Sequence, residues 1–291
     1  MDFKELDLTE IDANLSDEQQ KEWNSVYASY RGKSVLTGRV VGIDGNTITL
    51  TDKKTGERIR KKVLSLVVIN YRVKVIIPQN EAWFDLNSER PEHVFRSMIG
   101  SVIDYVITGI DRENECCTAS RRDALIMRRK TFAKSDLKTG KKVPVNILAV
   151  GSTHLLATYG GYDMTLSQRD LSYGMISDLK DKYHPGQIYT AVYKGYDGEN
   201  DTINISVKEA KPHPFIGIEI RHPLNSRRVS KISGKYKGGV FCKIEEELDC
   251  LCIYSQYECD EDYDIGDQVI VVITKYDYER RLVYGKIVAK L

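Results

Sequence analysis

Short runs of alternating apolar and polar residues, separated by Gly, Asp, Asn or Pro, recur along the chain and predict β-strands. The first run spans residues 33–43 and leads to Asp44-Gly45, a dipeptide typical of tight hairpin turns. A second hairpin is expected next, turning near residues 54–56. Two apolar runs follow, at 63–69 and 73–77, and a proline ends the second. The beginning of the chain is therefore expected to be mainly β.

One strand-turn-strand pattern, called the signature below, occurs three times, at Gly100–Arg122, Gly186–Lys208 and Gly266–Lys286. In each copy an Asp lies eleven residues after the first Gly, and a Glu lies two residues later. Because the copies begin 86 and 80 residues apart, the spacing suits a small β domain better than a solenoid repeat. The recurrence of Asp-x-Glu in three turns indicates turn chemistry rather than an acid/base pair.

Three helices are expected. Ser16 has the character of an N-cap, with acidic residues after it, and Trp23, Val26, Tyr27 and Tyr30 follow at helical spacing. This helix either packs on the first domain or carries a partner contact. Residues 90–98 resemble a short helix with Pro near its start, and residues 121–132 have helical composition with five basic residues.

The second and third signatures are preceded by similar elements. Strands are expected at 143–150, 155–159 and 162–166, with a helical stretch near 176–182, and again at 227–232, 240–244 and 249–254, with an acidic loop at 258–264. Each block thus consists of five short strands with a small helix between the third and fourth. That order is the one expected of an OB barrel.

We therefore expect a mainly β protein of three tandem OB-fold domains, each a five-stranded barrel, with a short N-terminal helix. The expected divisions are an acidic segment with the helix at 1–31, a first OB domain with a basic hairpin insert and a C-terminal basic helix at 32–134, a second OB domain at 141–211 and a third at 222–291. A chain of 291 residues has room for several such cores. Lys211–Pro214 (KPHP) forms a stiff linker because its prolines restrict their neighbours.

Charge and cysteine content narrow the class of protein. The formal net charge is only +1, but basic residues are concentrated between 31 and 140, whereas the first thirty residues are acidic. The chain has no long apolar run and no charged-then-apolar leader, which predicts a cytoplasmic protein. Six Cys with irregular spacing do not resemble a secreted disulfide framework.

Cys242, Cys250, Cys252 and Cys259 raise the question of a zinc site. Cys250 and Cys252 are two residues apart on one expected strand, where small residues fill a core, and the chain has no CxxC knuckle. Neither a phosphate-binding Gly loop nor a nucleophile elbow occurs. We expect no metal, no cofactor and no small-molecule substrate, and we expect no enzymatic activity.

Several motifs resemble the S-one domain, an RNA-binding OB module repeated in the bacterial small-subunit ribosomal protein S-one. The motifs are Gly266–Asp277 (GDQVIVVITKYD), Ile205–Lys208 (ISVK) followed by Pro212–Phe215 (PHPF), Gly238–Phe241 (GGVF), Val75–Pro78 (VIIP) followed by Glu81, and Ala119–Arg122 (ASRR). The resemblance covers roughly residues 32–291. The resemblance implies single-stranded RNA laid across strands two and three, with aromatic rings stacking on bases and basic residues following phosphates.

The stacking residues depart from the family pattern. Only Phe241 keeps the family's aromatic residue on strand two. On strand three, where a second aromatic residue and a His are usual, the three domains have Ile76 and Ile77, Thr165 and Leu166, and Leu251 and Ile253. With fewer stacking rings, RNA binding would depend more on charge, or some of the domains would bind protein instead.

Basic and aromatic residues supply the RNA-binding candidates. In the first domain they are the hairpin residues Lys53, Lys54, Arg58, Arg60, Lys61 and Lys62, together with Lys74, and the helix residues Arg121, Arg122, Arg128 and Arg129. In the second they are Tyr159, Tyr162, Lys194 and Tyr196, and in the third Tyr236, Lys237, Phe241, Lys243, Tyr276, Tyr278, Arg280 and Arg281. Ordinary solvated surface is the alternative for each group, and a helix that merely solubilises is the alternative for residues 121–132.

Two functions from different classes remain open. The first is non-catalytic binding of single-stranded RNA, on mRNA or at the ribosome in translation, in which tandem OB domains raise one another's effective concentration. The second is a protein-interaction scaffold that docks on the ribosome or RNA polymerase, which the acidic first thirty residues favour. An accessory subunit of a nuclease is a third alternative.

Overall fold

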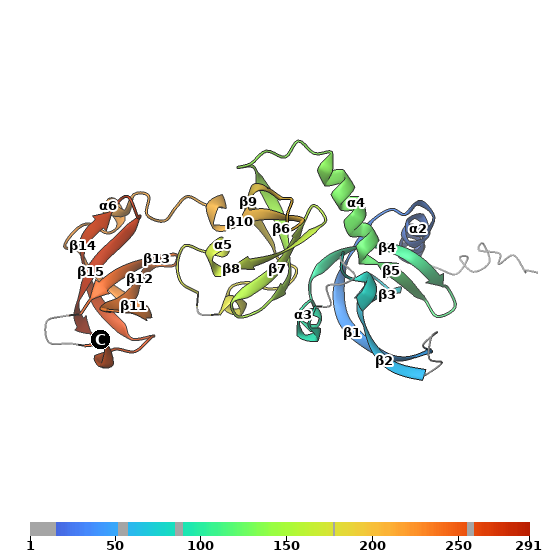
Figure 1. The fold of residues 1–291 in the computed structure, drawn as a ribbon, viewed down its shortest axis with the longest axis horizontal. Coiled ribbons are helices and arrows are strands. Elements are labelled where there is room, and N and C mark those ends of the chain that lie inside the picture. Colours follow the sequence, from blue (N-terminus) through green and yellow to red (C-terminus); the bar gives the residue numbers. More distant parts are fainter. Residues whose placement is uncertain (1–15, 52–57, 85–89, 177, 255–258) are drawn as a thin grey trace, which may run out of the picture.

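The computed structural model describes residues 16–51, 58–84, 90–176, 178–254 and 259–291, with side chains described for all of these except 46–51 and 58–62. Figure 1 shows three β units that follow one another along the longest axis of the molecule. We call them the first barrel, the second sheet and the third barrel. The expected mainly β fold class, with closed five-stranded barrels and a short N-terminal helix, is confirmed.

The first barrel closes in the order β1-β2-β3-β5-β4. Its strands are β1 (Leu36–Thr51), β2 (Arg58–Ile69), β3 (Lys74–Pro78), β4 (Val102–Asp111) and β5 (Cys116–Ser120), and its helices are α2 (Asp17–Gly32), the 3-10 turn η1 (Gln79–Glu81), α3 (Glu92–Arg96) and α4 (Arg121–Ala133). Pro91 precedes α3, as the sequence pattern predicts. Parallel pairing of β3 with β5 completes the barrel.

The expected turn at Asp44-Gly45 is wrong. β1 continues through both residues, with Asp44 opposite Ser65 and Gly45 opposite Leu64. An Asp-Gly pair permits a turn only if the residues that flank it pair with each other, whereas here β2 pairs with β1 from Val40 to Thr51. The Asp44 carboxylate instead accepts a hydrogen bond from Lys74 Nζ at 2.5 Å.

Helix α2 is docked on the first barrel. Ser16 and Gln19 form a reciprocal capping box at its start, and Trp23 and Val26 are buried in the core of the barrel. Ser29 Oγ accepts a hydrogen bond from the backbone N–H of Ile107 at 3.1 Å. Of the two alternatives for this helix, packing on the first domain is therefore observed.

The second sheet has the strand order β10-β9-β6-β7-β8. Its strands are β6 (Lys142–Val150), β7 (His154–Tyr159), β8 (Tyr162–Ser167), β9 (Ile188–Asp197) and β10 (Thr202–Ser206), with α5 (Gln168–Leu171) and the 3-10 turns η2 (Leu179–Asp181) and η3 (Lys208–Ala210). β8 and β10, whose counterparts pair in the two closed barrels, lie at the edges of this sheet. Just beyond them, Val207 N–H donates to the carbonyl of Asp170 at 2.8 Å and links the two edges.

The third barrel closes in the order β11-β12-β13-β15-β14. Its strands are β11 (Arg227–Tyr236), β12 (Gly239–Glu245), β13 (Leu248–Ile253), β14 (Gln268–Asp277) and β15 (Leu282–Lys290), with α6 (Ile218–Arg221) before the barrel and η4 (Asp260–Asp262) between β13 and β14. In the parts of the chain that the structure describes, no helix is long and apolar enough to cross a membrane.

The three signatures form hairpins of one kind. The carboxylates of Asp111 and Asp197 accept from the backbone and side chain of the Asn three residues later, and Asp277 accepts from Arg280 N–H. These hydrogen bonds stabilise the charged carboxylate and so lower the pKa of Asp111 and Asp197. The bond from the Asn side chain has the largest effect. The expectation that Asp-x-Glu serves the turn is confirmed.

Candidate nucleic-acid interface

Strand registers identify the same outer surface on all three β units. Val67 on β2 lies opposite Ile76, Leu156 on β7 opposite Thr165, and Phe241 on β12 opposite Leu251. These residues point away from their own core, because successive side chains of a strand alternate between its faces. We call this surface, formed by strands two and three of each unit, the strand 2–3 face.

Lys74 is the one candidate of the hairpin and strands of the first barrel whose side chain is described. Lys74 is on β3 and forms an ion pair with Asp44. Lys53 and Lys54 lie outside the described residues. Arg58, Arg60, Lys61 and Lys62 belong to β2, but their side chains are also outside the described part of the chain. The basic hairpin thus stays a prediction.

Protein covers part of the strand 2–3 face of the second sheet. Leu156 is only 5% exposed and belongs to the hydrophobic core cluster of the first barrel, whereas its neighbours Leu155 and Ala157 belong to the core of the second sheet. One pair further along, Asp163 on β8 binds Arg121 through two hydrogen bonds of 2.7 and 2.8 Å. This part of the face is an interface between the first two units, whereas Thr165, opposite Leu156, is exposed.

Helix α4 contributes to that interface through Arg121 and Arg129, so these two arginines serve packing. Arg121 is 1% exposed, and its guanidinium also donates to the carbonyl of Ala82. Arg129 lies over the rings of Phe84 and Tyr162, with its guanidinium carbon 3.5 and 4.1 Å from the ring centres. The expected RNA contact of Arg121 is at odds with its burial, because a buried and paired guanidinium offers no surface to a phosphate.

The other arginines among the α4 candidates, and Lys194 on β9, form ion pairs with carboxylates. Arg122 forms an ion pair with Glu81 at 2.7 Å, Arg128 with Asp104 at 2.6 Å, and Arg129 with Asp201. Lys194 pairs with Glu209 at 2.5 Å. A phosphate would have to compete with a carboxylate at each of these cations.

The tyrosines of the second sheet pack around Phe132 of α4. Its ring makes edge contacts with Tyr159, Tyr162 and Tyr193, at centroid distances of 5.9, 5.5 and 6.1 Å. Tyr196 packs on Tyr162, and its hydroxyl donates to Asp201 at 2.8 Å. Tyr159 and Tyr162 therefore contribute to the joint between α4 and the second sheet, and Tyr196 alone of the expected rings here is exposed, at 51%.

The third barrel retains an accessible aromatic pair. Phe241 on β12 packs against Tyr236 at 5.0 Å between ring centroids, and both rings are half-buried. Lys243 lies two residues further along β12, opposite Asp249, and exposed Lys237 is in the turn before β12. Neither lysine forms an ion pair with any residue whose side chain is described. Rings and free cations thus occur together on this strand 2–3 face.

The last hairpin adds further basic residues. Arg280 and Arg281 are exposed and, within the described ranges, form no side-chain ion pair. Tyr278 donates its hydroxyl to Glu219 and packs edge-on against Phe215 at 5.7 Å, and Tyr276 packs on Tyr278. The tyrosines therefore hold the linker, whereas the two arginines face solvent.

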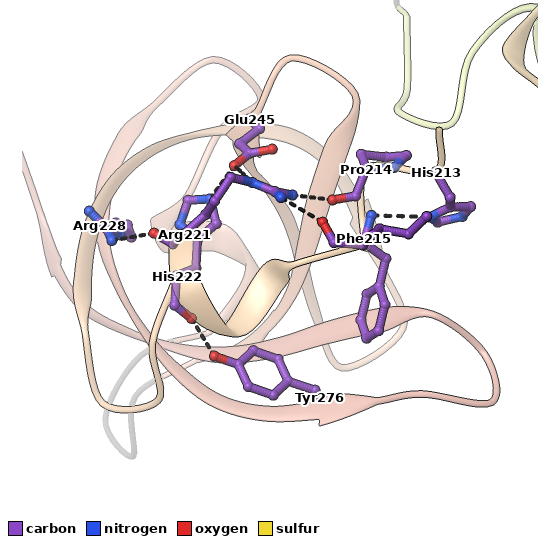
Figure 2. Close-up of polar contacts among 9 residues, drawn as sticks. His213, Pro214, Phe215, Arg221, His222, Arg228, Glu245 and Tyr276 are labelled. Atoms are coloured by element: carbon purple, nitrogen blue, oxygen red, sulfur yellow. Dashed lines mark hydrogen bonds and ion pairs between the residues drawn. The ribbon is translucent and has the colours of Figure 1, made fainter. Parts of the chain in front are cut away.

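Figure 2 shows how the linker before the third barrel is fixed to it. The Arg221 side chain reaches from α6 to Glu245 at 2.8 Å and to the carbonyl of Pro214, while His222 Nε2 lies 2.7 Å from the same Glu245 carboxylate. Burial raises the pKa of Glu245, but the hydrogen bonds from Arg221 and His222 outweigh burial and lower it. Because Glu245 ends β12, the strand that carries Phe241 is anchored to the linker.

The cysteines do not form a ligand cluster. Cys242, Cys250 and Cys252 are fully buried in the core of the third barrel, and Cys259 is exposed in another segment. Over the described residues, no group of three or more His, Cys, Asp or Glu side chains is arranged to hold a metal ion.

Sequence patterns missed residues that lie beside Phe241. A cavity of about 680 Å³ separates the second sheet from the third barrel, and its walls include Phe241 together with Arg169, Ser172, Tyr173 and Lys208. These four belong to a loop and to short helical turns of the second sheet, so no strand periodicity marks them. Only the folded chain brings them next to Phe241.

No protein-family model matches this chain. Small ribosomal subunit protein bS1 from three bacteria is similar in sequence. The protein of Coxiella burnetii is 25% identical over 192 residues, which cover 62% of this chain and 34% of that protein. The resemblance to the S-one domain family is thus confirmed at low identity. The chain spans about a third of the length of this relative.

A relative with another name also matches. The 4-hydroxy-3-methylbut-2-enyl diphosphate reductase of Clostridium tetani is 23% identical over 182 residues, covering 58% of this chain and 28% of that protein. Among solved structures, a multidomain protein with nucleic acid binding domains from Streptococcus pneumoniae covers 88% of this chain and 73% of its own, with 9% identity and a TM-score of 0.20. That TM-score is too low to relate the two structures.

Proposed function

We propose that this chain binds single-stranded RNA without catalysis and that the strand 2–3 face of the third barrel is its principal described binding surface. The observation that carries the proposal is the packing of Phe241 on Tyr236 beside Lys237 and Lys243, which form no ion pair with a side chain in the described part of the chain. Stacking of a base on an aromatic ring is worth about 1–3 kcal/mol and tolerates every base, while Lys and Arg add attraction to phosphates.

The three units would contribute unequally. Part of the face of the second sheet is covered by α4 and the first barrel, so the second sheet would contribute less to binding by avidity than the other two units. The first barrel would add the basic hairpin, and the third barrel would add the rings. Similarity to bS1 supports mRNA or the ribosome as the setting, and a cytoplasmic location would follow from either.

The test is fluorescence anisotropy with a labelled, unstructured RNA of about 20 nucleotides, titrated at several salt concentrations. Wild-type protein should bind with an affinity that falls steeply as salt rises. Phe241→Ala should weaken binding about 5- to 100-fold, and Phe241→Tyr should retain most of it. Tyr30→Ala is the matched control, because Tyr30 is an exposed ring on α2, 43% accessible. Equal losses in the two alanine variants would contradict the assignment.

A scaffold that docks on the ribosome or RNA polymerase is the second candidate. The observation that favours it is that the strand 2–3 face of the second sheet already binds polypeptide, through Leu156 and Asp163. The same surface on the third barrel would then bind a partner protein. If wild-type protein fails to bind RNA even at low salt, this candidate replaces the first.

A further inference from the structure

We propose that the cavity between the second sheet and the third barrel holds one nucleotide of the bound RNA, so that the strand passes from the third barrel onto the second sheet. This proposal rests on the proposed function. The cavity measures about 680 Å³, within the range of about 300–1,000 Å³ typical of sites for small ligands. Phe241 and Asp249 line it from the third barrel, and the segment from Gln168 to Met175 lines it from the second sheet.

The cavity has an aromatic ring on each side. Phe241 belongs to the third barrel and Tyr173 to the loop after α5. Tyr173 is half-buried and is supported from behind by the linker residue His213, at a ring distance of 4.2 Å. A ring held by a neighbour is a preorganised stacking surface, because it loses little side-chain entropy when a base packs on it. Bases on Phe241 and Tyr173 would belong to one continuous strand.

Positive charge surrounds the cavity. Lys208 Nζ lies 5.2 Å from the centre of the Tyr173 ring, and exposed Arg169 lines the same wall. Burial lowers the pKa of His213, and the nearby charges of Arg281 and Lys208 lower it further. Two cations of the second sheet, Arg169 and Lys208, therefore line this cavity, which favours a phosphate there.

The acidic residues nearby are already engaged. One oxygen of Asp249 accepts from Met175 N–H at 3.1 Å, and the other accepts from Ser233 Oγ at 3.1 Å. Glu209 is paired with Lys194, and Glu247 with Lys182 at 2.9 Å. Their charges are thus partly compensated, which reduces the repulsion of a phosphate.

Ser172 supplies a hydrogen-bonding group that lacks a partner. It is 5% exposed and lines the cavity, and its Oγ is buried without a hydrogen-bond partner. A buried hydroxyl without a partner costs about 1–3 kcal/mol, and a base edge or a ribose hydroxyl would satisfy it. The wall of the cavity therefore contains one unpaired hydroxyl, that of Ser172.

The sharpest test is Ser172→Ala in the full chain, measured with the same RNA of about 20 nucleotides. Removal of an unpaired buried hydroxyl should leave thermal stability unchanged or raise it, while RNA affinity falls about 2- to 10-fold. A purely structural Ser172 would instead lower the melting temperature. Lower stability with unchanged affinity would overturn the proposal.

The second test compares Tyr173→Ala with Tyr173→Phe. The alanine variant should bind RNA about 5- to 100-fold more weakly, and phenylalanine should restore binding because it keeps the ring. Ultraviolet crosslinking of wild-type protein to uridine-rich RNA should attach a nucleotide to the peptide that contains Tyr173. Wild-type affinity in Tyr173→Ala would overturn the proposal, even if Phe241→Ala still weakens binding and so supports the proposed function.

Two further experiments test the role of Lys208 and whether the cavity binds an RNA strand or a free nucleotide. Lys208→Gln should reduce the dependence of affinity on salt by about one phosphate contact, whereas Lys138→Gln, at an 82% exposed lysine in another linker, should not. Adenosine monophosphate should compete only weakly with RNA if the cavity serves a strand. Competition as strong as that of the oligonucleotide would assign the cavity to a free nucleotide and overturn the proposal. Failure of wild-type protein to bind RNA at all would remove both this proposal and the proposed function.

Discussion

Arg121 and Asp163 form a two-point ion pair that joins the first barrel to the second sheet. Both guanidinium Nη atoms donate to the carboxylate, at 2.8 and 2.7 Å, and the two side chains are only 1% and 9% exposed. Arg121 begins α4, and Asp163 lies on the strand 2–3 face of the second sheet. The pair therefore occupies a surface on which an OB fold would otherwise bind its ligand.

The first prediction concerns loss of one partner of this pair. Arg121→Met should lower the free energy of unfolding by about 3–5 kcal/mol, because it leaves the buried Asp163 carboxylate unpaired. Arg121→Met combined with Asp163→Leu should recover most of that loss, since no buried charge remains. Urea unfolding followed by circular dichroism measures both. If the double variant is as unstable as the single one, packing rather than charge is the main contribution of Arg121.

The second prediction is a pH dependence. Burial raises the pKa of Asp163, but the charge and hydrogen bonds of Arg121 outweigh it and lower the pKa below its ordinary value. The pair thus contributes its full stability above the unfolded-state pKa of about 3.9, and loses it as pH falls through the lower folded-state pKa. The stability difference between wild type and Asp163→Asn should therefore be constant near neutral pH and shrink below about pH 4. A difference that persists unchanged in acid would contradict this account.

The third prediction uses two neighbouring cations of α4. Arg129 packs on Phe84 and Tyr162, donates to the carbonyl of Gly161 at 3.0 Å and pairs with Asp201, whereas the next residue, Lys130, is exposed. Arg129→Ala should cost about 1–3 kcal/mol of stability, and Lys130→Ala less than about 0.5 kcal/mol. Thermal unfolding of both variants provides the measurement. Similar melting temperatures would show that α4 does not stabilise the joint through Arg129.

Most of the strand positions could be predicted, because apolar and polar residues alternate along a strand wherever one of its faces is buried and the other is exposed to solvent. The short helix α3 and the start of α2 could be predicted too, since Pro91 and Ser16 are local signals. The turn predicted at Asp44-Gly45 was wrong because the pairing of β2 with Val40–Thr51 of β1 is decided by residues far apart in sequence. The hydrogen bonds of a long strand ladder outweigh the preference of two residues for a turn.

The site could be predicted only in part. Phe241 was found because a family motif carries it, but the burial of Arg121 has no signature in a single sequence. One available signal was the run Leu155-Leu156-Ala157, in which three successive apolar residues indicate a strand covered on both faces. Tyr173 gave no signal, and Lys208 was marked only as the end of a family motif, because the role of both residues depends on how two units meet.

The fourth prediction concerns the basic hairpin of the first barrel. Six basic residues lie within ten positions there, with Glu57 as the acidic residue among them. Replacing Lys53, Lys54, Lys61 and Lys62 by Glu should abolish most RNA binding at moderate salt and leave the folded state intact. Anisotropy titrations together with far-ultraviolet circular dichroism check both parts. Unchanged affinity would remove the hairpin from the binding surface and leave the third barrel as the principal contributor.

The fifth prediction separates backbone strain from loss of the joint. Gly161 has φ +86°, and a Cβ there would lie 2.5 Å from the carbonyl oxygen of Leu125 and 2.8 Å from the backbone N of Arg129, both on α4. Gly140 has nearly the same conformation, with φ +92°, but a Cβ there would meet nothing within 4 Å. Gly140→Ala should therefore cost about 1–2 kcal/mol through strain alone.

Gly161→Ala should cost more than Gly140→Ala, because α4 must also move away from the second sheet. Limited proteolysis should then cut within residues 121–140 faster in Gly161→Ala than in Gly140→Ala, since opening of the joint exposes α4. Equal stability and equal cleavage in the two variants would show that α4 can shift at little cost. In that case the strand 2–3 face of the second sheet would be accessible, and a third RNA-binding surface would have to be considered for this chain.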